Sequence, residues 1–449
     1  MSKKIRDFLF YFFVVAFIVG TTLLSLYASG YKFNLSWPLN FNRLLIKTGM
    51  LALDSSPKDA MIYIDGELEA DSSWRPWKKS YLITPAKIKN MMPGDYEVRF
   101  EKEGYWPFQR KISIYSGQTT FLEDITLFKS GNPNITAIVG ENSENENISL
   151  SDSGKHIYLS ETKAIIELEN GEQKTINSDN SLKADGVWQK GDKLFLQGVM
   201  YSSDINGENE DYHKLIGDSS SDWKIDGENS IIYYRSENSL NSFNLNQKTA
   251  KVVVNKNDFT DYQVKNGNIF FVSKNNNAIS LQEFSLDTQK IEKEFILPNN
   301  GDYYFASAPE NMLILRDKRN EAIYIFNQNA IEEGYRSIAK ANDFDLANNE
   351  TIFFINNWEI HRFDIKQNKS ELLTRLSESL QEIAADQKDN YLLFTGEKKI
   401  GVYDLKTGFI TIVLEADQIG SSVLDTKNDI LYFWGKVGGQ AGVYSIPIK

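Results

Sequence analysis

The chain has no cysteine among its 449 residues. This absence excludes disulfide bonds, thiolate nucleophiles, zinc sites with cysteine ligands and the lipid-modified cysteine of bacterial lipoproteins. Histidine is almost as scarce, because only His156, His213 and His361 occur, far apart and without ligand-like spacing. A histidine-based metal or catalytic site would require the fold to gather them; the alternative is that they are ordinary surface or turn residues. We therefore predict no metal, no cofactor and no catalytic residues.

Basic residues are also in deficit, and unevenly so. The net charge of the whole chain is −12, but residues 1–47 carry +5, residues 48–129 carry −1 and residues 130–449 carry −16. An acidic body is repelled by phosphate backbones and by anionic lipid. Nucleic acid is therefore not an expected partner.

Long apolar runs are absent except at the start of the chain. Residues 8–27 read FLFYFFVVAFIVGTTLLSLY, without one charge, which matches the roughly 30 Å hydrocarbon core at about 1.5 Å per residue. Lys3, Lys4 and Arg6 precede this run, and the positive-inside rule then keeps the N-terminus in the cytoplasm. We predict a cytoplasmic segment at 1–7, a single membrane-spanning helix at 8–28, a juxtamembrane linker at 29–47 and an extracytoplasmic remainder.

A cleaved signal peptide is the alternative interpretation of the same run. Its apolar region is usually shorter, roughly 7–15 residues, and is followed by small residues at the cut. Ala28, Ser29 and Gly30 could serve as such a site. Both interpretations export the remainder of the chain.

Residues 48–129 show the pattern of a small all-β module. Ser55-Ser56-Pro57 interrupts a first apolar strand, and Met61 to Ile64 start another that ends in the turn Asp65-Gly66. Pro93-Gly94 marks a further turn, after which Tyr96, Val98 and Phe100 alternate on one face. The pattern predicts short antiparallel strands packed as a β-sandwich.

The same residues resemble the PEGA domain family over about 48–128. The matching positions follow the family pattern in order; they are Ser55, Pro57 and Ala60, then Ile62 to Gly66, Thr84-Pro85, Pro93-Gly94, Tyr96, Val98, Lys102, Gly104 and Tyr105. Two departures stand out: Asp59 replaces the usual glycine, and Glu67 to Ile83 are inserted before Thr84. The resemblance implies a spacer or docking module on surface or membrane-anchored proteins, with no catalytic residues.

From residue 134 to the end, a unit of about forty residues repeats. Each unit has a polar turn followed by a short apolar strand, and successive strands are 37 to 43 residues apart; their marker residues are Ile157, Leu194, Ile231, Ile269, Met312, Ile352, Leu392 and Ile430. Further strands joined by polar turns follow in most units, as in residues 400–414. Four short strands in each unit predict one blade of a β-propeller.

The two ends of this region predict how the propeller closes. The last unit stops after its third strand at Lys449, whereas residues 134–139 (NITAIV) form an orphan strand before the first unit. Placing the orphan strand in the last blade would close the ring and remove a free edge. We predict an all-β protein with an eight-bladed propeller at 134–449; seven blades are the alternative, because the second unit is irregular around residues 199–217.

The candidate sites are few. Asp204, Asn206, Glu208 and Glu210 alternate like calcium ligands, but Asn209 stands where such a loop needs glycine, and the alternative is a solvated acidic loop. The best binding candidate is the inserted hairpin, where Trp74, Arg75, Trp77, Lys78 and Lys79 combine residue types common in interaction hot spots or at lipid interfaces. The alternative is that both tryptophans pack back on the protein. Trp188, Trp223, Trp358 and Trp434 are predicted to pack between blades, and Tyr105, Trp106 and Phe108 in a core or domain contact.

These observations favour a non-enzymatic, membrane-anchored protein of the cell envelope. In this hypothesis the PEGA-like module is a spacer or docking unit, and the propeller recognises an envelope protein or a surface polysaccharide. One alternative is an anchored propeller enzyme, a hydrolase or lyase acting on glycans. Another is an assembly factor that offers blade edges to the strands of exported clients. The oligomeric state is open.

Overall fold

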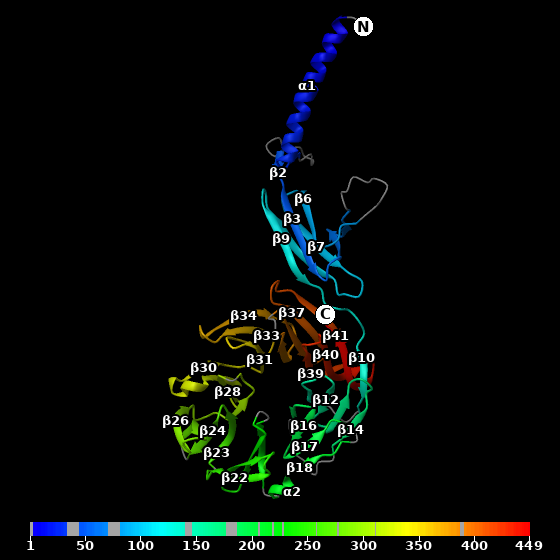
Figure 1. The fold of residues 1–449 in the computed structure, drawn as a ribbon. Helices are drawn as coiled ribbons and strands as arrows, with labels where there is room; N and C mark the ends of the chain where they lie inside the picture. Colours follow the sequence, from blue (N-terminus) through cyan, green and yellow to red (C-terminus); the bar gives the residue numbers. More distant parts are fainter. Residues whose placement is uncertain are drawn as a thin grey trace. The chain divides into compact units, whose positions relative to one another are not determined.

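The protein is described here from a computed structural model (Figure 1). It describes residues 3–33, 45–70, 81–139, 146–176, 186–204, 207–217, 220–226, 229–256, 258–275, 278–309, 311–386 and 390–449. The chain divides into two compact units, Met1–Gly131 with Lys449, and Asn132–Ile448.

The first unit begins with the helix α1 (Lys3–Ala28). Within α1, residues Ile5–Ala28 have a mean hydropathy of 2.3 and are long and apolar enough to cross a membrane, although a signal sequence would pass the same test. Large apolar side chains of α1 are exposed, among them Phe8, Phe17 and Leu24. The predicted apolar helix is therefore present in the structure.

After α1, a hairpin of β1 (Tyr31–Phe33) and β2 (Leu45–Lys47) precedes two packed sheets. One sheet has the order β6-β3-β9 and the other β5-β4-β7-β8. Their strands are β3 (Gly49–Ser56), β4 (Met61–Ile64), β5 (Glu67–Leu68), β6 (Ala86–Met91), β7 (Gly94–Glu101), β8 (Phe108–Ile114) and β9 (Thr119–Thr126). Side chains from both sheets fill the core, including Leu51, Leu53, Ile62, Val98 and Phe100, each at most 1% exposed. The predicted β-sandwich-like module is confirmed.

The motif residues of this module hold one another rather than a ligand. Thr84, fully buried, meets the Ser55 hydroxyl at 2.6 Å and accepts the backbone N–H of Ala60 at 3.0 Å. Asp59 has φ 65°, a left-handed conformation that glycine adopts without strain. This conformation explains why a glycine is usual at that position, and it makes Asp59 a tolerated departure from the pattern.

The described part of the second unit forms eight four-stranded antiparallel sheets. Each sheet takes the name of the strand that comes first in the following lists. The first four sheets contain β11 (Ile148–Leu150), β12 (His156–Leu159), β13 (Ala164–Glu167) and β14 (Gln173–Thr175); β15 (Val187–Gln189), β16 (Lys193–Leu196), β17 (Val199–Ser202) and β18 (Glu210–Asp211); β19 (Ser221–Asp226), β20 (Ile231–Ser236), β21 (Ser239–Asn244) and β22 (Thr249–Val254); β23 (Phe259–Lys265), β24 (Asn268–Asn275), β25 (Ala278–Ser285) and β26 (Lys290–Leu297).

The remaining sheets complete the unit. They contain β27 (Tyr303–Ala306), β28 (Met312–Asp317), β29 (Ala322–Asn327) and β30 (Tyr335–Ile338); β31 (Asp343–Asn348), β32 (Thr351–Asn356), β33 (Glu359–Asp364) and β34 (Lys369–Arg375); β35 (Leu380–Ala385), β36 (Tyr391–Gly396), β37 (Lys399–Asp404) and β38 (Ile410–Glu415); β39 (Gln418–Asp425), β40 (Ile430–Val437), β41 (Gln440–Pro447) and β10 (Asn134–Ile138). A short helix α2 (His213–Ile216) follows β18, and the 3-10 helix η2 (Gln328–Glu333) lies between β29 and β30.

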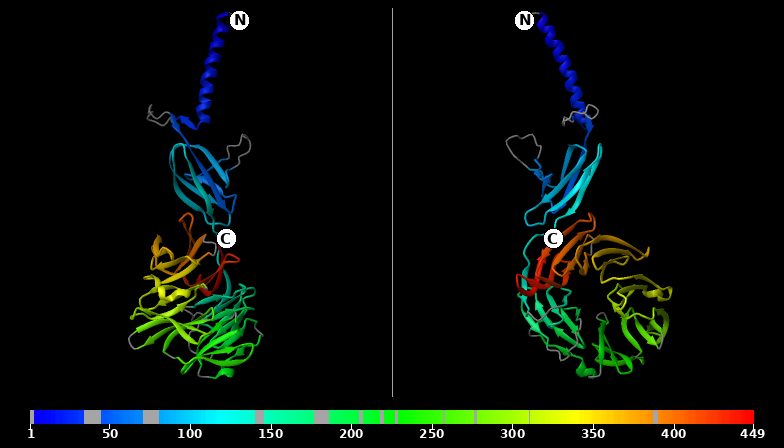
Figure 2. Two further views of the ribbon diagram at one scale, coloured as in Figure 1. Left: turned by 60° about the vertical axis from the view of Figure 1, so that its left-hand side comes forward. Right: turned by 180° about the vertical axis from the view of Figure 1, so that it is seen from behind.

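Figures 1 and 2 show the sheets following one another in chain order around a ring, with the first and last sheets adjacent. The predicted propeller is therefore confirmed, and the choice of eight blades over seven stays a prediction. Closure occurs as predicted, because the orphan strand β10 pairs with β41, with Ile135 opposite Tyr444. The turn after β13 lies against β10, with Gly171 close to the carbonyl of Thr136. Gln173, which begins β14, donates a hydrogen bond to the carbonyl of Ile138 at 2.8 Å.

Apolar side chains fill the spaces between neighbouring sheets. One such core joins the last sheet to the first and contains Trp434 and Val443 together with Ile157 and Ile166. Trp188 and Trp223 also pack against cores between sheets, as predicted. Trp358 does not: it lies in the turn between β32 and β33 and is 56% exposed.

In the first unit, the packing prediction holds for Phe108, which is 2% exposed. Tyr105 is half-buried. Trp106 is 36% exposed and does not pack in the core of this unit; the alternative of a domain contact stays a prediction. It lies outside the strands, between the bridge residue Tyr105 and Pro107.

Candidate functional site

The binding site expected from sequence, Trp74, Arg75, Trp77, Lys78 and Lys79, lies outside the described residues. Its flanks are described: Ala70 forms an isolated bridge with Tyr81, and Met61 forms one with Ile83. Tyr81 and Ile83 are 50% and 43% exposed. The hairpin prediction remains a prediction.

Several half-buried carboxylates lie on the first strands of sheets in the second unit. In each case a carboxylate on one sheet accepts a backbone N–H from the first strand of the next sheet. The pairs are Asp261 with Phe305 N (2.7 Å), Asp343 with Ile383 N (3.1 Å), Asp345 with Ala385 N (2.8 Å) and Glu382 with Ser422 N (2.7 Å). First strands have a free edge, so these carboxylates satisfy amides that sheet pairing leaves open.

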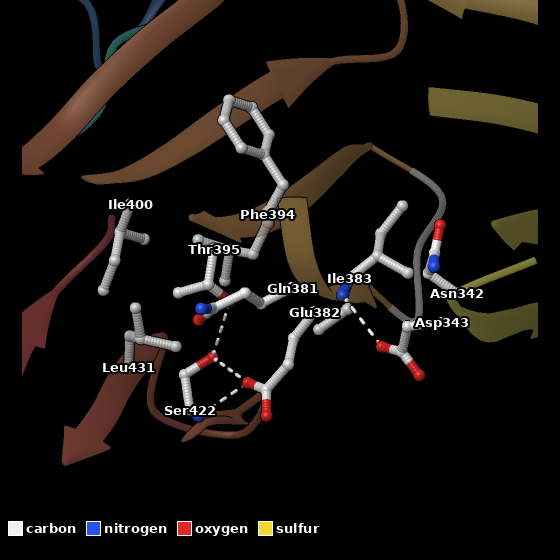
Figure 3. A pocket seen from close by; sticks show the side chains of 12 residues that line it. Asn342, Asp343, Gln381, Glu382, Ile383, Phe394, Thr395, Ile400, Ser422 and Leu431 are labelled. Carbon is white, nitrogen blue, oxygen red and sulfur yellow. Dashed lines mark hydrogen bonds between the residues drawn. The ribbon is translucent and has the colours of Figure 1, made fainter. Parts of the chain in front are cut away.

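One cavity opens beside these carboxylates, between the β35 sheet and the β39 sheet. Its volume is about 370 Å³. Figure 3 shows Glu382 and Ser422 side by side, with Ile400 and Leu431 on one side of them and Asp343 on the other. The full lining is Asn342, Asp343, Gln381, Glu382, Ile383, Ala384, Leu393, Phe394, Thr395, Ile400, Ser422 and Leu431. This combination of apolar walls and a few converging polar groups is typical of a ligand pocket.

Burial separates the floor of this pocket from its mouth. Leu393, Ile400 and Leu431 are each at most 3% exposed and form an apolar floor. Gln381 is exposed, and Asp343, Glu382 and Ser422 are half-buried. The polar side chains therefore form the solvent-facing side of the pocket.

The electrostatics of the mouth are unusual because its carboxylates are partly desolvated. Burial raises the pKa of Glu382, the nearby charge of Asp343 raises it further, and hydrogen bonds from Ser422 and Ser421 oppose the rise. Burial likewise raises the pKa of Asp343, against hydrogen bonding from Ile383 N and the charge of Arg316. A cation at this mouth would relieve the cost of both negative charges.

The three histidines are not brought together. His156 Nδ1 lies 3.2 Å from Asp192, His213 Nε2 lies 2.5 Å from the carbonyl of Gln197, and His361 Nε2 lies 2.9 Å from Glu359. His361 also stacks on Phe354, with ring centroids 4.8 Å apart. Each histidine thus has its own local structural partner.

His156 borders a second, more open cavity of about 800 Å³ between the β11 and β15 sheets. Its lining mixes Lys155 and His156 with acids such as Glu172 and Asp192. Asp192 also accepts the Ser153 hydroxyl at 2.5 Å. Ser153 and His156 thus share one carboxylate oxygen, and the arrangement fixes the turn of one sheet against the turn of the next.

The acidic segment considered for calcium is only partly described, because Asn206 lies outside the described residues. Glu210 is paired with Lys193 at 3.3 Å and with the Tyr212 hydroxyl at 2.9 Å. Across the part of the chain that the structure describes, no group of three or more His, Asp or Glu side chains is placed to hold a metal ion.

Sequence reasoning did not select Asp343, Glu382 or Ser422. The signal was weak, because these residues precede the marker residues of their units by 9, 10 and 8 positions. Bulges in β35 and β39 shift the spacing. Only the strand register shows that Glu382, opposite Thr395, corresponds to Asp343, opposite Ile355.

Comparison with known proteins agrees with this architecture. The PEGA domain model matches residues 78–127, inside the module described above. A PEGA domain is thus present in the first unit. No curated protein matches the chain.

Solved structures with detectable similarity are distant. The Dos1 propeller is 13% identical, with 71% of this chain and 96% of that chain covered and a TM-score of 0.49. The extracellular domain of the putative hybrid two component system BT4673 from B. thetaiotaomicron is 11% identical, covering 70% of this chain and 39% of that chain at a TM-score of 0.41. Kluyveromyces lactis Hsv2 is 13% identical, covering 48% and 71% at a TM-score of 0.35. No functional argument rests on these scores.

Proposed function

We propose that this protein is a membrane-anchored recognition protein whose propeller binds a partner outside the cytoplasm, without catalysis. The observation that carries the proposal is α1. None of its apolar window is buried inside the protein, and an exposed apolar surface of this size requires a lipid or protein environment. Two β units follow it in the chain.

The order of the units supports their roles. The PEGA domain comes between the apolar helix and the propeller in the chain, and its motif residues Ser55, Ala60 and Thr84 are used for its own packing. It is thus suited to be a spacer or docking unit near the bilayer. The acidic propeller, which carries most of the negative charge of the chain, suits a partner with basic or hydrogen-bond-donating groups.

A glycan hydrolase or lyase is the alternative, and the carboxylates Asp343 and Glu382 at one pocket are the observation that favours it. Such enzymes use two acids that face the scissile bond. Here Asp343 and Glu382 each already accept a backbone N–H from a neighbouring sheet. This engagement favours binding, and turnover of surface glycans by the purified protein would establish the enzyme instead.

The absence of cysteine allows a direct test of topology. A single cysteine introduced as Glu169→Cys, at an exposed turn of the propeller, should react in intact cells with a membrane-impermeant maleimide. Ser2→Cys, before the apolar helix, should react only after lysis. Labelling of the second variant but not of the first in intact cells would overturn the proposal.

Partner capture from membranes tests the recognition role and the predicted hairpin together. The full chain should retain envelope components that a Trp74→Ala/Trp77→Ala variant loses if the hairpin binds them. A capture pattern shared by both proteins would assign recognition to another surface, and the absence of capture by the unaltered chain would contradict the recognition role.

A further inference from the structure

The pocket between the β35 and β39 sheets is lined in part by a small side chain on β35. Ala384 lies opposite Leu393 on β36. At the same register position the β23, β31 and β39 sheets have Gln263, Asp345 and Leu424. Each of these is larger than alanine, whereas the β11 sheet has the small Ser149 at this position.

Residues on β36 differ from those of some other sheets as well. Where the β35 sheet has Leu393, the β23 and β31 sheets have Phe270 and Phe353, and the β39 sheet has Leu431. Thr395 stands opposite Glu382, where siblings have Val272, Ile355 and Phe433 opposite the corresponding residue. Compared with the β23 and β31 sheets, the β35 sheet therefore leaves more room beside its first two strands. An opening with apolar walls and a few converging polar groups is a candidate site for a small ligand.

The chemistry of the lining restricts that occupant. Its charged members are the two carboxylates Asp343 and Glu382, and it contains no lysine, arginine or histidine. Arg316 lies 3.6 Å from Asp343 and donates a hydrogen bond to the carbonyl of Asn342. Neither of these two contacts of Arg316 involves Glu382. The mouth thus offers hydrogen-bond acceptors and net negative charge, while the floor is apolar.

We propose that this pocket binds the ammonium group of a small apolar amine, with the ammonium at Asp343 and Glu382 and the apolar body against Leu393, Ile400 and Leu431. The ligand class rests on the recognition function proposed above and specifies it. The same chemistry is found in a free alkylamine and in the N-terminus of a polypeptide with an apolar first residue.

Shape and charge both favour this class over its close analogues. An alcohol of the same length could fill the floor but would leave the two carboxylates uncompensated. A carboxylic acid would place a third negative charge at the mouth, which like-charge repulsion disfavours. A long basic side chain such as lysine would enter with its charged end first and would carry that charge to the apolar floor, where desolvation penalises it.

The test uses the full chain in nanodiscs and isothermal titration with n-butylammonium, n-butanol and butyrate. We expect binding of n-butylammonium alone, and affinity that increases about fourfold with each added CH₂ from methyl- to n-butylammonium. Leucine amide should bind and N-acetyl-leucine amide should not, which shows whether a polypeptide N-terminus is accepted. Equal binding of n-butanol or of the acetylated compound would overturn the proposal.

Variants assign the site. Glu382→Gln keeps an oxygen for the Ser422 N–H and should weaken n-butylammonium binding at least tenfold. Leu393→Phe, which places in the β35 sheet the residue type that the β23 and β31 sheets carry there, should abolish binding by filling the floor. Glu415→Gln, at an exposed carboxylate on β38 of the same sheet, is the control and should leave affinity within twofold. Binding that survives both Glu382→Gln and Leu393→Phe in folded protein would refute the assignment.

The outcomes separate this proposal from the proposed function. If the cysteine labels report an exported propeller and the chain captures partners while n-butylammonium does not bind, only the ligand class fails. If n-butylammonium binds and the cysteine of Glu169→Cys does not react in intact cells, the ligand class is supported and the extracytoplasmic role is contradicted.

Discussion

Glu382 on β35 and Ser422 on β39 are joined by two hydrogen bonds to one carboxylate oxygen, from the Ser422 N–H at 2.7 Å and from its hydroxyl at 3.0 Å. The pair connects two sheets that share no backbone ladder. A half-buried carboxylate therefore replaces strand pairing as the link at this point of the ring. The arrangement ties the stability of the ring to the protonation of Glu382.

The first prediction concerns pH and Glu382. Burial raises its folded-state pKa above the ordinary value of 4.5, so the folded protein holds the proton more readily than the unfolded chain. The contribution to stability is therefore complete below pH 4.5 and is lost as pH rises through the folded-state pKa. Glu382→Gln, which cannot ionise, should raise the melting temperature at pH 7.5 by about 1–3 °C.

The pH profile distinguishes this cause from a general effect of the substitution. The gain from Glu382→Gln should shrink as pH falls toward 4.5, as measured by calorimetry in a pH series. Glu415→Gln, whose side chain is 69% exposed in the parent, should show a difference that is constant across the series. A gain for Glu382→Gln that does not depend on pH would contradict the assignment.

The second prediction concerns ring closure. Gly171 has φ 71°, and a Cβ atom there would lie 2.5 Å from the carbonyl oxygen of Thr136 on β10. Gly191 has φ 77° but nothing within 4 Å of such a Cβ. The left-handed backbone should lower the free energy of unfolding of both alanine variants by about 1–2 kcal/mol. Gly171→Ala should lower it by about 1–3 kcal/mol more, because the new Cβ displaces β10.

Hydrogen exchange locates that effect. In Gly171→Ala, amides of β10 and β41 should exchange faster, whereas in Gly191→Ala they should exchange as in the parent. Equal exchange of β10 in the two variants would show that the turn after β13 does not hold the closing strand.

How far the sequence determines these features depends on their range along the chain. The apolar helix, the PEGA motif and the period of the repeat are local patterns, and all three appear in the structure. Even the closing strand was predictable, because a final unit with three strands lacks one and residues 134–139 are a strand without a unit. These predictions needed only alternation, turn residues and counting.

The pocket could not be predicted in this way. Its residues come from five strands of two sheets and from the start of β31. Bulges change the spacing of Glu382 and Ser422 from their marker residues. Trp358 failed for a related reason: it sits in the two-residue turn between β32 and β33, where a side chain points to solvent whatever its hydrophobicity. Periodicity shows which residues of a strand share a face. The register between strands and the packing of the sheets determine which side chains meet.

The third prediction concerns the PEGA motif. Thr84→Val removes the hydroxyl that meets Ser55 and accepts the Ala60 N–H, so a buried donor is left unpaired at a cost of about 1–3 kcal/mol. Thr119→Val, at a half-buried position on β9, is the control and should change stability little. Exchange of the amides of β3 and β6 measures the local effect; if Thr84→Val protects them as well as the parent does, the motif is not what joins the two segments.

The fourth prediction uses the two tryptophans that the sequence did not distinguish. Trp434 is 3% exposed in the core between the last and first sheets, so Trp434→Ala should lower the free energy of unfolding by about 3–5 kcal/mol. Trp358 is 56% exposed, and Trp358→Ala should change it by less than about 0.5 kcal/mol. Urea titrations followed by circular dichroism compare the two directly. Similar losses in both variants would mean that Trp358 packs in solution and that the exposed turn is wrong, whereas a large loss in Trp434→Ala alone ties stability to the interface where the ring closes.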